Sequence, residues 1–276
     1  MAMVPTAMVP LSGCATAPMT QGSSLSSYDR LTPSDGVLTK SLVRVNKDVV
    51  LASKTIRIVP TAFPATAAPA LEDKQRILVA NAVDRSLCLG LSERFEVVDT
   101  KAPADLTVHA VVTQATATDE VAAGASKVVS IVPAALGIPA PVPRLPIGLG
   151  SLTLESEALD TMGKQQAAMI WARGADSFTT SAVVSKAGDA YDLAASFGSD
   201  LSGLLVTGNS PFGKLPNAPS LQKIGASLGG KPKYVACEAF GRGAGVVGMI
   251  AGRVGMPPEW SDKGATAPAN EHESSQ

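Results

Sequence analysis

The sequence predicts an α+β fold, in which helices pack on one face of a mainly antiparallel sheet within a single domain. Three observations lead to this prediction. Apolar residues recur with helical spacing over Leu71 to Leu91, and the stretch from Ser151 to Arg173 alternates like two strands joined by a tight turn. A second amphipathic stretch then runs to Gly208. Further strand-like segments lie before and between these elements, and the order of strand, helix, strands, hairpin and helix favours one sheet covered by helices.

The first part of the chain supplies one helix and three strands. Lys54 to Pro60 alternates in polarity, which predicts a strand. Leu71 to Leu91 carries apolar residues around most of its circumference, so we expect a helix that is mostly buried. Two further strands are expected at Arg94 to Val98 and at Leu106 to Thr113. Residues 28–36 precede all of these elements and are expected to form an exposed lead-in.

The clearest signal is a hairpin. Its strands are expected at Ser151 to Leu159 and at Gln165 to Ala172, and Asp160 to Gly163 has Asp first and Gly last, which suits a tight turn. The helix that follows is expected to be capped by Asp189 and to end at Gly208.

The same residues carry a resemblance. Gly148-Leu-Gly150-Ser151, the turn from Asp160 to Gly163, and Trp171-Ala-Arg173 resemble a family of bacterial lipoproteins known as domain of unknown function 3313. The resemblance runs from Tyr28-Asp29 to Gly208, about two thirds of the chain. It implies a fold and a lipid anchor, without a reaction. The layout is also similar to the small domains of accessory lipoproteins in envelope transport and assembly machines, a likeness of fold alone.

Composition excludes several classes of protein. The chain has 276 residues, 45% of them hydrophobic and 17% charged, which is enough material for a substantial core. Lys and Arg number 23 against 24 for Asp and Glu, without a basic cluster, so nucleic acid is not expected as a partner. No apolar run approaches the ~18–20 residues that span a bilayer, so attachment to a membrane would need a lipid or a protein.

Leu11-Ser12-Gly13-Cys14 resembles the lipobox of bacterial lipoproteins, in which the Cys thiol is joined to diacylglycerol and the preceding peptide is removed. In the alternative reading, Cys14 is an ordinary small residue of a disordered terminus. Residues 1–13 contain no Lys or Arg, unlike a typical signal peptide, which favours a start inside a longer signal. The absence of Asp at Thr16 favours the outer membrane, facing the periplasm.

The expected organisation follows from these signals. We expect a signal peptide at 1–13, a lipidated flexible linker at 14–40, and the α+β lipoprotein domain at 41–208. A Gly- and Pro-rich extension is expected at 209–260, and a disordered tail at 261–276.

Three motifs resemble nucleotide or acyl-enzyme sites. Gly208 to Lys214 has Walker A spacing but lacks the hydroxyl residue that binds magnesium, so we interpret it as a helix end and loop. Gly243 to Gly248 matches a dinucleotide fingerprint after a strand-like stretch from Tyr234 to Phe240, with too little chain left for the fold. Ser220 to Lys223 lacks partner motifs and is better explained as the start of a short helix.

Other candidate chemistry is sparse. His109 lies in a predicted strand and His272 in the polar tail, which leaves no catalytic triad or His-rich metal site. Glu155 and Glu157 share one strand face, and exposed positions explain them better than a glycosidase pair. We therefore expect no catalytic residues, no metal, no cofactor and no enzymatic activity.

Two stretches suggest interactions. Val128 to Gly150 is apolar but interrupted by prolines, so it either wraps over the core or presents an apolar loop to a partner or lipid surface. In the C-terminal extension small residues recur at helical spacing, which favours either helix pairing and self-association or a flexible Gly-rich tail. The glycines concerned are Gly241, Gly245, Gly248, Gly252 and Gly255.

Cys88 and Cys237 are the thiols that remain once Cys14 is lipidated. An even pair of Cys residues in an oxidising compartment makes them a disulfide candidate that would hold the extension on the core. The alternative is that Cys88 is a small buried apolar residue.

Three functions remain from different classes. The first is a lipid-anchored, non-catalytic accessory or structural lipoprotein of the cell envelope, acting in an envelope protein complex. The second is a periplasmic carrier of a lipid or another small ligand. The third is a periplasmic hydrolase. A ligand pocket beside residues 128–150 would favour the carrier, and a flat apolar patch would favour the accessory subunit.

Overall fold

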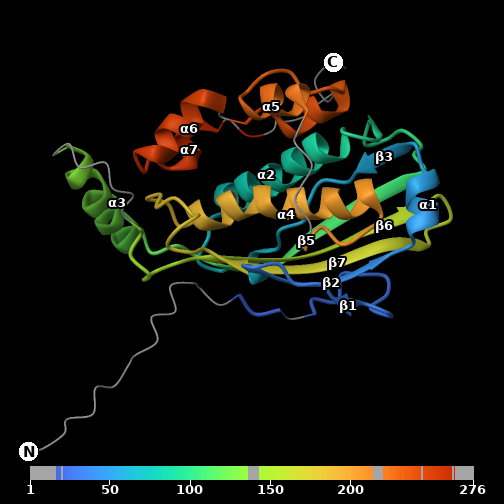
Figure 1. The fold of residues 1–276 in the computed structure, drawn as a ribbon, viewed down its shortest axis with the longest axis horizontal. Coiled ribbons are helices and arrows are strands. Elements are labelled where there is room, and N and C mark those ends of the chain that lie inside the picture. The colour runs from blue at the N-terminus through green and yellow to red at the C-terminus, as the bar shows by residue number, and fades with distance from the viewer. Residues whose placement is uncertain are drawn as a thin grey trace, which may run out of the picture.

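A computed structural model describes residues 17–19, 21–135, 143–213, 220–243, 245–262 and 264. One sheet lies beneath a layer of two long helices, and the C-terminal helices form a further layer above these (Figure 1). Within the described ranges, no helix is both long enough and apolar enough to cross a bilayer.

The described chain forms seven strands, seven α-helices and two 3₁₀ helices. The strands are β1 (Thr32–Pro33), β2 (Thr39–Val45), β3 (Thr55–Ile58), β4 (Glu96–Val98), β5 (Leu106–Thr116), β6 (Ser151–Asp160) and β7 (Gln165–Gly174). The α-helices are α1 (Lys47–Ala52), α2 (Asp73–Leu91), α3 (Glu120–Ala135), α4 (Gly188–Thr207), α5 (Leu221–Ser227), α6 (Gly245–Arg253) and α7 (Pro258–Ser261). Two 3₁₀ helices are η1 (Ala65–Ala67) and η2 (Val235–Phe240).

The sheet has seven strands in the order β1-β2-β7-β6-β5-β3-β4. Strand β3 runs parallel to β4 and β5, and the other neighbours are antiparallel. The predicted α+β class with a mainly antiparallel sheet is therefore confirmed. The three strands at its centre, β5, β6 and β7, are the longest, because the hairpin lets two 10-residue strands pair along their whole length.

The core lies between the sheet and the helix pair α2 and α4. Trp171 of β7 is fully buried and meets Phe197 of α4 edge to face, with ring centroids 5.7 Å apart. The two helices approach closely because small residues face each other. A Cβ at Gly198 would overlap Ser86, and one at Gly90 would overlap Ser202. Bulkier residues at these glycines would push the helices apart.

The structure agrees with the predicted helices and corrects one cap. Helix α4 ends at Gly208, whose φ of +62° in the left-handed region suits glycine. Asp189 does not cap the helix, because Ala187 occupies the N-cap position. Asp189 instead lies buried in the first turn, where it accepts a hydrogen bond from Gly150 N (2.7 Å) and pairs with Arg144.

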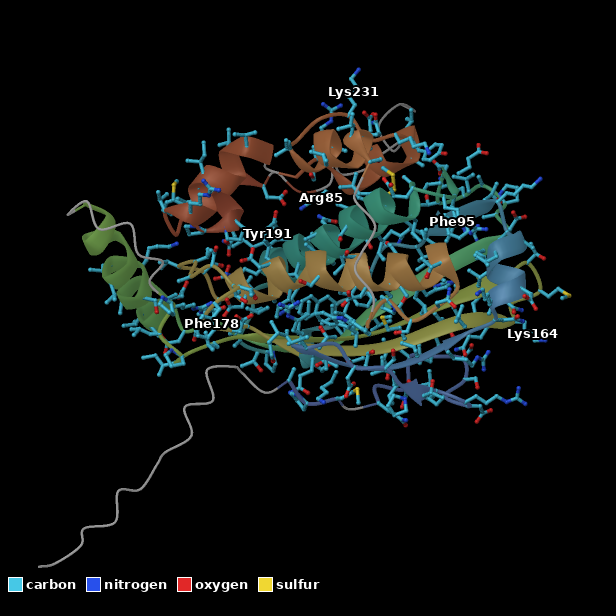
Figure 2. The ribbon with its side chains drawn as sticks, viewed as in Figure 1. Arg85, Phe95, Lys164, Phe178, Tyr191 and Lys231 are labelled. Atoms are coloured by element: carbon cyan, nitrogen blue, oxygen red, sulfur yellow. A yellow bond between two sulfur atoms is a disulfide. The ribbon has the colours of Figure 1, made fainter. Side chains whose placement is uncertain are left out.

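The expected strand at Tyr234 to Phe240 is wrong, because this segment forms the 3₁₀ helix η2. The expected disordered tail also begins too early. Ser261 ends α7, and Asp262 is buried against Arg85 of α2, with which it forms an ion pair. Figure 2 shows Arg85 and Tyr191 in the region between the helix pair and the C-terminal layer.

Candidate functional site

The segment that follows the expected anchor lies against the sheet. Cys14 itself lies outside the described residues, whose first range is 17–19. At that start, the Pro18 carbonyl accepts a hydrogen bond of 3.1 Å from the Thr153 hydroxyl of β6. Residues 21–31, which we call the strap, then cross the face of the sheet opposite the helices. The expected flexible linker at 14–40 is therefore corrected over its described residues from 21 onward.

Glu155 of β6 binds the first half of the strap. Its carboxylate accepts hydrogen bonds from Gly22 N (2.6 Å), Ser24 N (3.0 Å), the Ser24 hydroxyl and the Tyr28 hydroxyl (2.6 Å). Glu155 can do this because alternate residues of β6 point away from the helices, toward the strap. The interpretation of Glu155 as an exposed strand residue is wrong, since it is only 1% exposed.

Glu157, two residues further along β6, binds the next part of the strap. It accepts hydrogen bonds from Ser26 N (2.8 Å), the Ser26 hydroxyl (2.6 Å) and the Gln165 side-chain amide (2.7 Å). Glu157 is also buried, contrary to expectation. Between these polar contacts, Leu25 packs in an apolar cluster with Ala168 and Ile170 of β7. The strap is therefore held by the burial of apolar side chains and by two carboxylates that accept hydrogen bonds from its backbone N–H groups.

The charges of the strap site are set by these contacts. Burial of Glu155 would raise its pKa, but the hydrogen bonds from Ser24, Tyr28 and the backbone amides outweigh burial and lower it. Burial raises the pKa of Tyr28, and its hydrogen bond to Glu155 adds to the effect. At neutral pH a charged acceptor therefore faces a protonated phenol, and charge-assisted hydrogen bonds of this kind are stronger than neutral ones.

The two disulfide candidates lie together. Cys88 of α2 and Cys237 of η2 form a disulfide with Cα atoms 5.8 Å apart, and both residues are buried. The bond joins the C-terminal layer to the helix pair across 149 positions of sequence.

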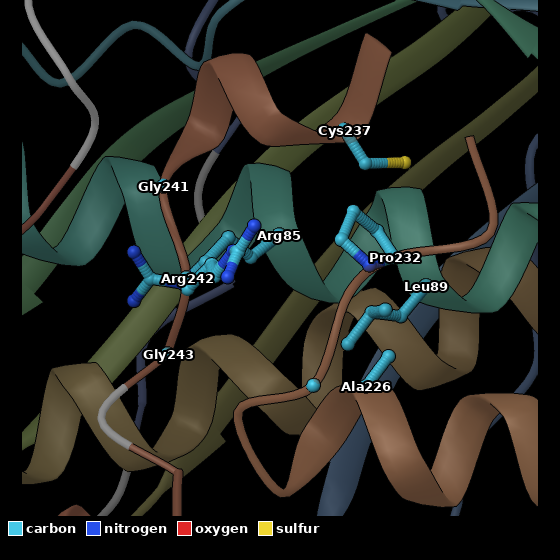
Figure 3. Close-up of a pocket in the computed structure, with 9 residues that line it drawn as sticks. Arg85, Leu89, Ala226, Pro232, Cys237, Gly241, Arg242 and Gly243 are labelled. Carbon is cyan, nitrogen blue, oxygen red and sulfur yellow. The ribbon is translucent and has the colours of Figure 1, made fainter. Parts of the chain in front are cut away.

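A small hollow lies beside the disulfide (Figure 3). The hollow is lined in part by Arg85, Leu89 and Arg242. The volume within it that a water molecule can occupy is only about 30 Å³. That space holds one or two waters, far below the few hundred Å³ of a typical ligand pocket. Arg85 is also engaged, because it donates to the Phe240 carbonyl (3.2 Å) and pairs with Asp262.

Two carboxyls, those of Asp84 and Asp192, have strongly raised pKa values. Burial raises the pKa of Asp84 to about 7, although Thr61 donates to it through its backbone N–H and its hydroxyl. Burial also raises the pKa of Asp192 to about 7, and the nearby charge of Asp189 adds to the shift. Shifted carboxyls can mark acid–base catalysts. Neither of these lines the hollow, and Asp84 is tied to Thr61 in a structural contact.

The structure places several of the remaining predicted residues. His109 lies directly across from Glu157 in the β5–β6 register, beneath the same face as the strap. Among the described residues, no group of three or more His, Cys, Asp or Glu side chains could hold a metal ion. Gly208 of the Walker-like motif ends α4, and Lys214 lies outside the described residues.

The glycine run is helical in part. Gly245 begins α6, and Gly248 and Gly252 lie within it, whereas Gly241 follows η2 outside any helix. A Cβ at Gly252 would meet no atom within 4 Å. The space in which a side chain at this position would lie is therefore open.

The strap could not be recognised from composition, because its Ser and Gly residues are typical of a linker. The sequence signal for a packed segment was the presence of three apolar residues, Leu25, Tyr28 and Leu31. They pack in the cluster with Ala168 and Ile170.

Comparisons with known proteins agree with the family resemblance. A family model described as "Protein of unknown function (DUF3313)" matches residues 20–201. No curated protein matches the chain. Among solved structures, two crystal forms of the PelC dodecamer from Paraburkholderia phytofirmans are similar at 11% identity, one of them a point variant. They cover 58% and 59% of this chain and 95% and 96% of PelC, with TM-scores of 0.33 and 0.34.

Proposed function

The chain belongs to the DUF3313 family, whose function is unknown, and we propose that it is a lipid-anchored, non-catalytic accessory or structural lipoprotein of the bacterial cell envelope. The proposal places it at the outer membrane, facing the periplasm, with acyl chains on Cys14 as the anchor.

The observation that carries the proposal is the position of the strap relative to the lipobox. Pro18, the fourth residue after Cys14, is already hydrogen-bonded to β6. An extended chain of four residues reaches about 14 Å at most. Acyl chains on Cys14 would thus hold the folded domain against the bilayer rather than at the end of a long tether. Glu155 and Glu157 would then have a structural role, because they bind the strap, the segment that connects the anchor to the folded domain.

Two features support an accessory role over a carrier or a hydrolase. The hollow beside the disulfide has room for water only, whereas a carrier needs a cavity that matches its ligand. The paired carboxylates that most resemble a hydrolytic site, Glu155 and Glu157, are covered by the strap and use their oxygens to hold it. Neither is positioned to act on a substrate in this arrangement.

The exposed side of α6 supports a partner protein or self-association. Val246, Val247 and Ile250 are each at least half exposed, and the Cβ position of Gly252 is open. Exposed apolar side chains grouped on one helix are typical of an interaction surface.

Cys14→Ser tests the anchor. We expect the Ser variant to incorporate no labelled palmitate and to leave the membrane fraction, because stable attachment needs two or more acyl chains. The control is the double variant Cys88→Ala with Cys237→Ala, which keeps Cys14 and should be labelled like the wild type. Equal labelling of the Ser variant and the wild type would disprove the proposal.

A further inference from the structure

We propose that the exposed face of α3 is a membrane-contact surface that rests on the lipid bilayer. This inference builds on the proposed lipid anchor at Cys14 and specifies which end of the molecule faces the lipid.

Helix α3 turns apolar side chains to the outside. Val121 is 83% exposed, Val128 63% and Val129 45%, whereas Ala123 and Ser126 on the other side of the helix are buried. Residues four and seven positions apart share a helix face, so Val121, Ala125 and Val128 form one outward stripe. This polarity is the reverse of an ordinary surface helix. Figure 1 shows α3 projecting from one end of the body.

Charge is absent from this stripe. Lys127 is the one charged residue between Glu120 and Arg144 in the sequence. Its ammonium group is turned toward α6, where it donates to the carbonyls of Arg253 (2.9 Å) and Gly252 (3.4 Å). A cation at the C-terminal end of a helix is favourable, so α6 keeps this charge away from the apolar stripe.

The strap begins at the same end of the molecule as α3. Just before α3, Asp119 N donates to the Gly148 carbonyl (2.9 Å), and Gly148 lies three residues before β6. Thr153, which binds Pro18, is the third residue of β6. Thr153 lies five positions after Gly148, a span of about 17 Å at most. The base of α3 and the end of the strap nearest Cys14 are therefore both held at the start of β6.

The uncharged apolar stripe of α3 and its position at the end nearest Cys14 indicate that the stripe contacts lipid. Pro18 is the fourth residue after Cys14, so this end lies within about 14 Å of the acylated position, which is less than the diameter of a small domain. A folded partner has little room in that gap, whereas an apolar helix stripe can enter the boundary of headgroups and acyl chains. Ile147, which is 58% exposed, is a further apolar side chain beside Gly148, whose carbonyl binds Asp119 N at the base of α3.

The experiment uses an anchor that does not depend on natural lipidation. A full chain with Cys14→Ser and a hexahistidine tag directly before position 14 is bound to phosphatidylethanolamine–phosphatidylglycerol vesicles that contain a nickel-chelating lipid. An environment-sensitive NBD dye is attached at Val128→Cys. The matched control is Met162→Cys, 85% exposed in the β6–β7 turn beside Lys164, which Figure 2 shows at the opposite end of the molecule. Val121→Cys is a second site on the α3 stripe.

We expect the dye at 128 and at 121 to shift to the blue on vesicle binding and to be quenched at least twofold by spin-labelled lipid, with no change at 162. Equal, water-like emission at all three sites would overturn the inference. A blue shift without quenching by lipid would also overturn it, because it would indicate contact with protein. The mass of the natural Cys14 protein reports acylation separately, so failure of the anchor and failure of the α3 surface give different results.

Discussion

Replacing both Cys88 and Cys237 by Ala should lower the free energy of unfolding and loosen the C-terminal layer first. The disulfide joins α2 to η2, and both residues are buried. Alanine avoids placing a polar group in the core. The remaining contacts of this layer with the helix pair include the buried side chain of Phe240 and the ion pair between Arg85 and Asp262.

The magnitude follows from the length of chain between the two cysteines. For a separation of 149 residues, the loop-entropy relation gives about 5 kcal/mol at 25 °C. Measured losses on removing native disulfides are typically about 2–5 kcal/mol, because the unfolded state retains some structure. We expect the double variant to lose about 2–5 kcal/mol of its free energy of unfolding. Much of this loss arises because the unfolded chain is no longer closed into a loop across 149 positions.

Urea unfolding of the oxidised wild type and the double variant measures the loss, and hydrogen exchange locates it. Amides of residues 221–262 should lose protection by more than tenfold, while those of β6 and β7 under the same conditions serve as the internal reference. Peptide mapping without reductant checks the bond itself. Two thiols that are free and alkylatable in the native protein, or a loss below about 0.5 kcal/mol with unchanged exchange, would refute the reasoning.

Two other changes test the strap and the helix contact. Glu155→Gln should increase amide exchange at Gly22 and Ser24 by more than tenfold, because each hydrogen bond to a charged group contributes about 1.5–3 kcal/mol. Because the pKa of Glu155 is lowered, the stabilisation that its carboxylate provides is complete above the usual pKa of 4.5 and is lost as the pH falls toward the lowered value. The Gln variant should therefore show a smaller loss of amide protection in the strap between neutral and acid pH. Identical pH profiles for the variant and the wild type would contradict this. Gly198→Ala should destabilise the protein by about 1–3 kcal/mol by overpacking against α2, whereas Gly252→Ala, with open space around it, should stabilise by up to about 1 kcal/mol in thermal unfolding. Equal melting temperatures for the two alanine variants would show that the close approach of α2 and α4 is not tight.

The local sequence pattern was sufficient to predict the helices and strands that bury one apolar face. Helices α2 and α4 and the β6–β7 hairpin could be predicted because helical and strand periods differ, and the turn residues from Asp160 to Gly163 mark the reversal. Strand β2 could not be recognised as readily, since Thr39 and Ser41 are the buried positions of its first half. Small polar residues on the core face hide the apolar alternation.

The strap was missed for a different reason. Period-two alternation correctly separates the two faces of β6, but it cannot reveal that a distant segment covers the second face. Glu155 and the strap residues it binds are 127 to 133 positions apart. Similarly, the prolines after Val128 favour a segment that wraps over the core or an apolar loop. Helix α3 begins earlier, after Asp119, whose carboxylate accepts from Ala122 N (2.9 Å), and it contains Pro133 only near its end.

The family match divides the molecule in a way that bears on its task. It begins at residue 20, just before the strap, and ends at residue 201 within α4. The sheet, the strap and the disulfide residue Cys88 lie inside the matched range, whereas Cys237 and the helices α5, α6 and α7 lie outside it. The strap and the sheet therefore belong to the matched region, whereas the layer with the exposed apolar side of α6 lies beyond it and is joined to α2 by the disulfide. The strap and α6 lie on opposite sides of the sheet (Figure 1), so the proposed anchor at Cys14 would leave the exposed side of α6 open to a partner.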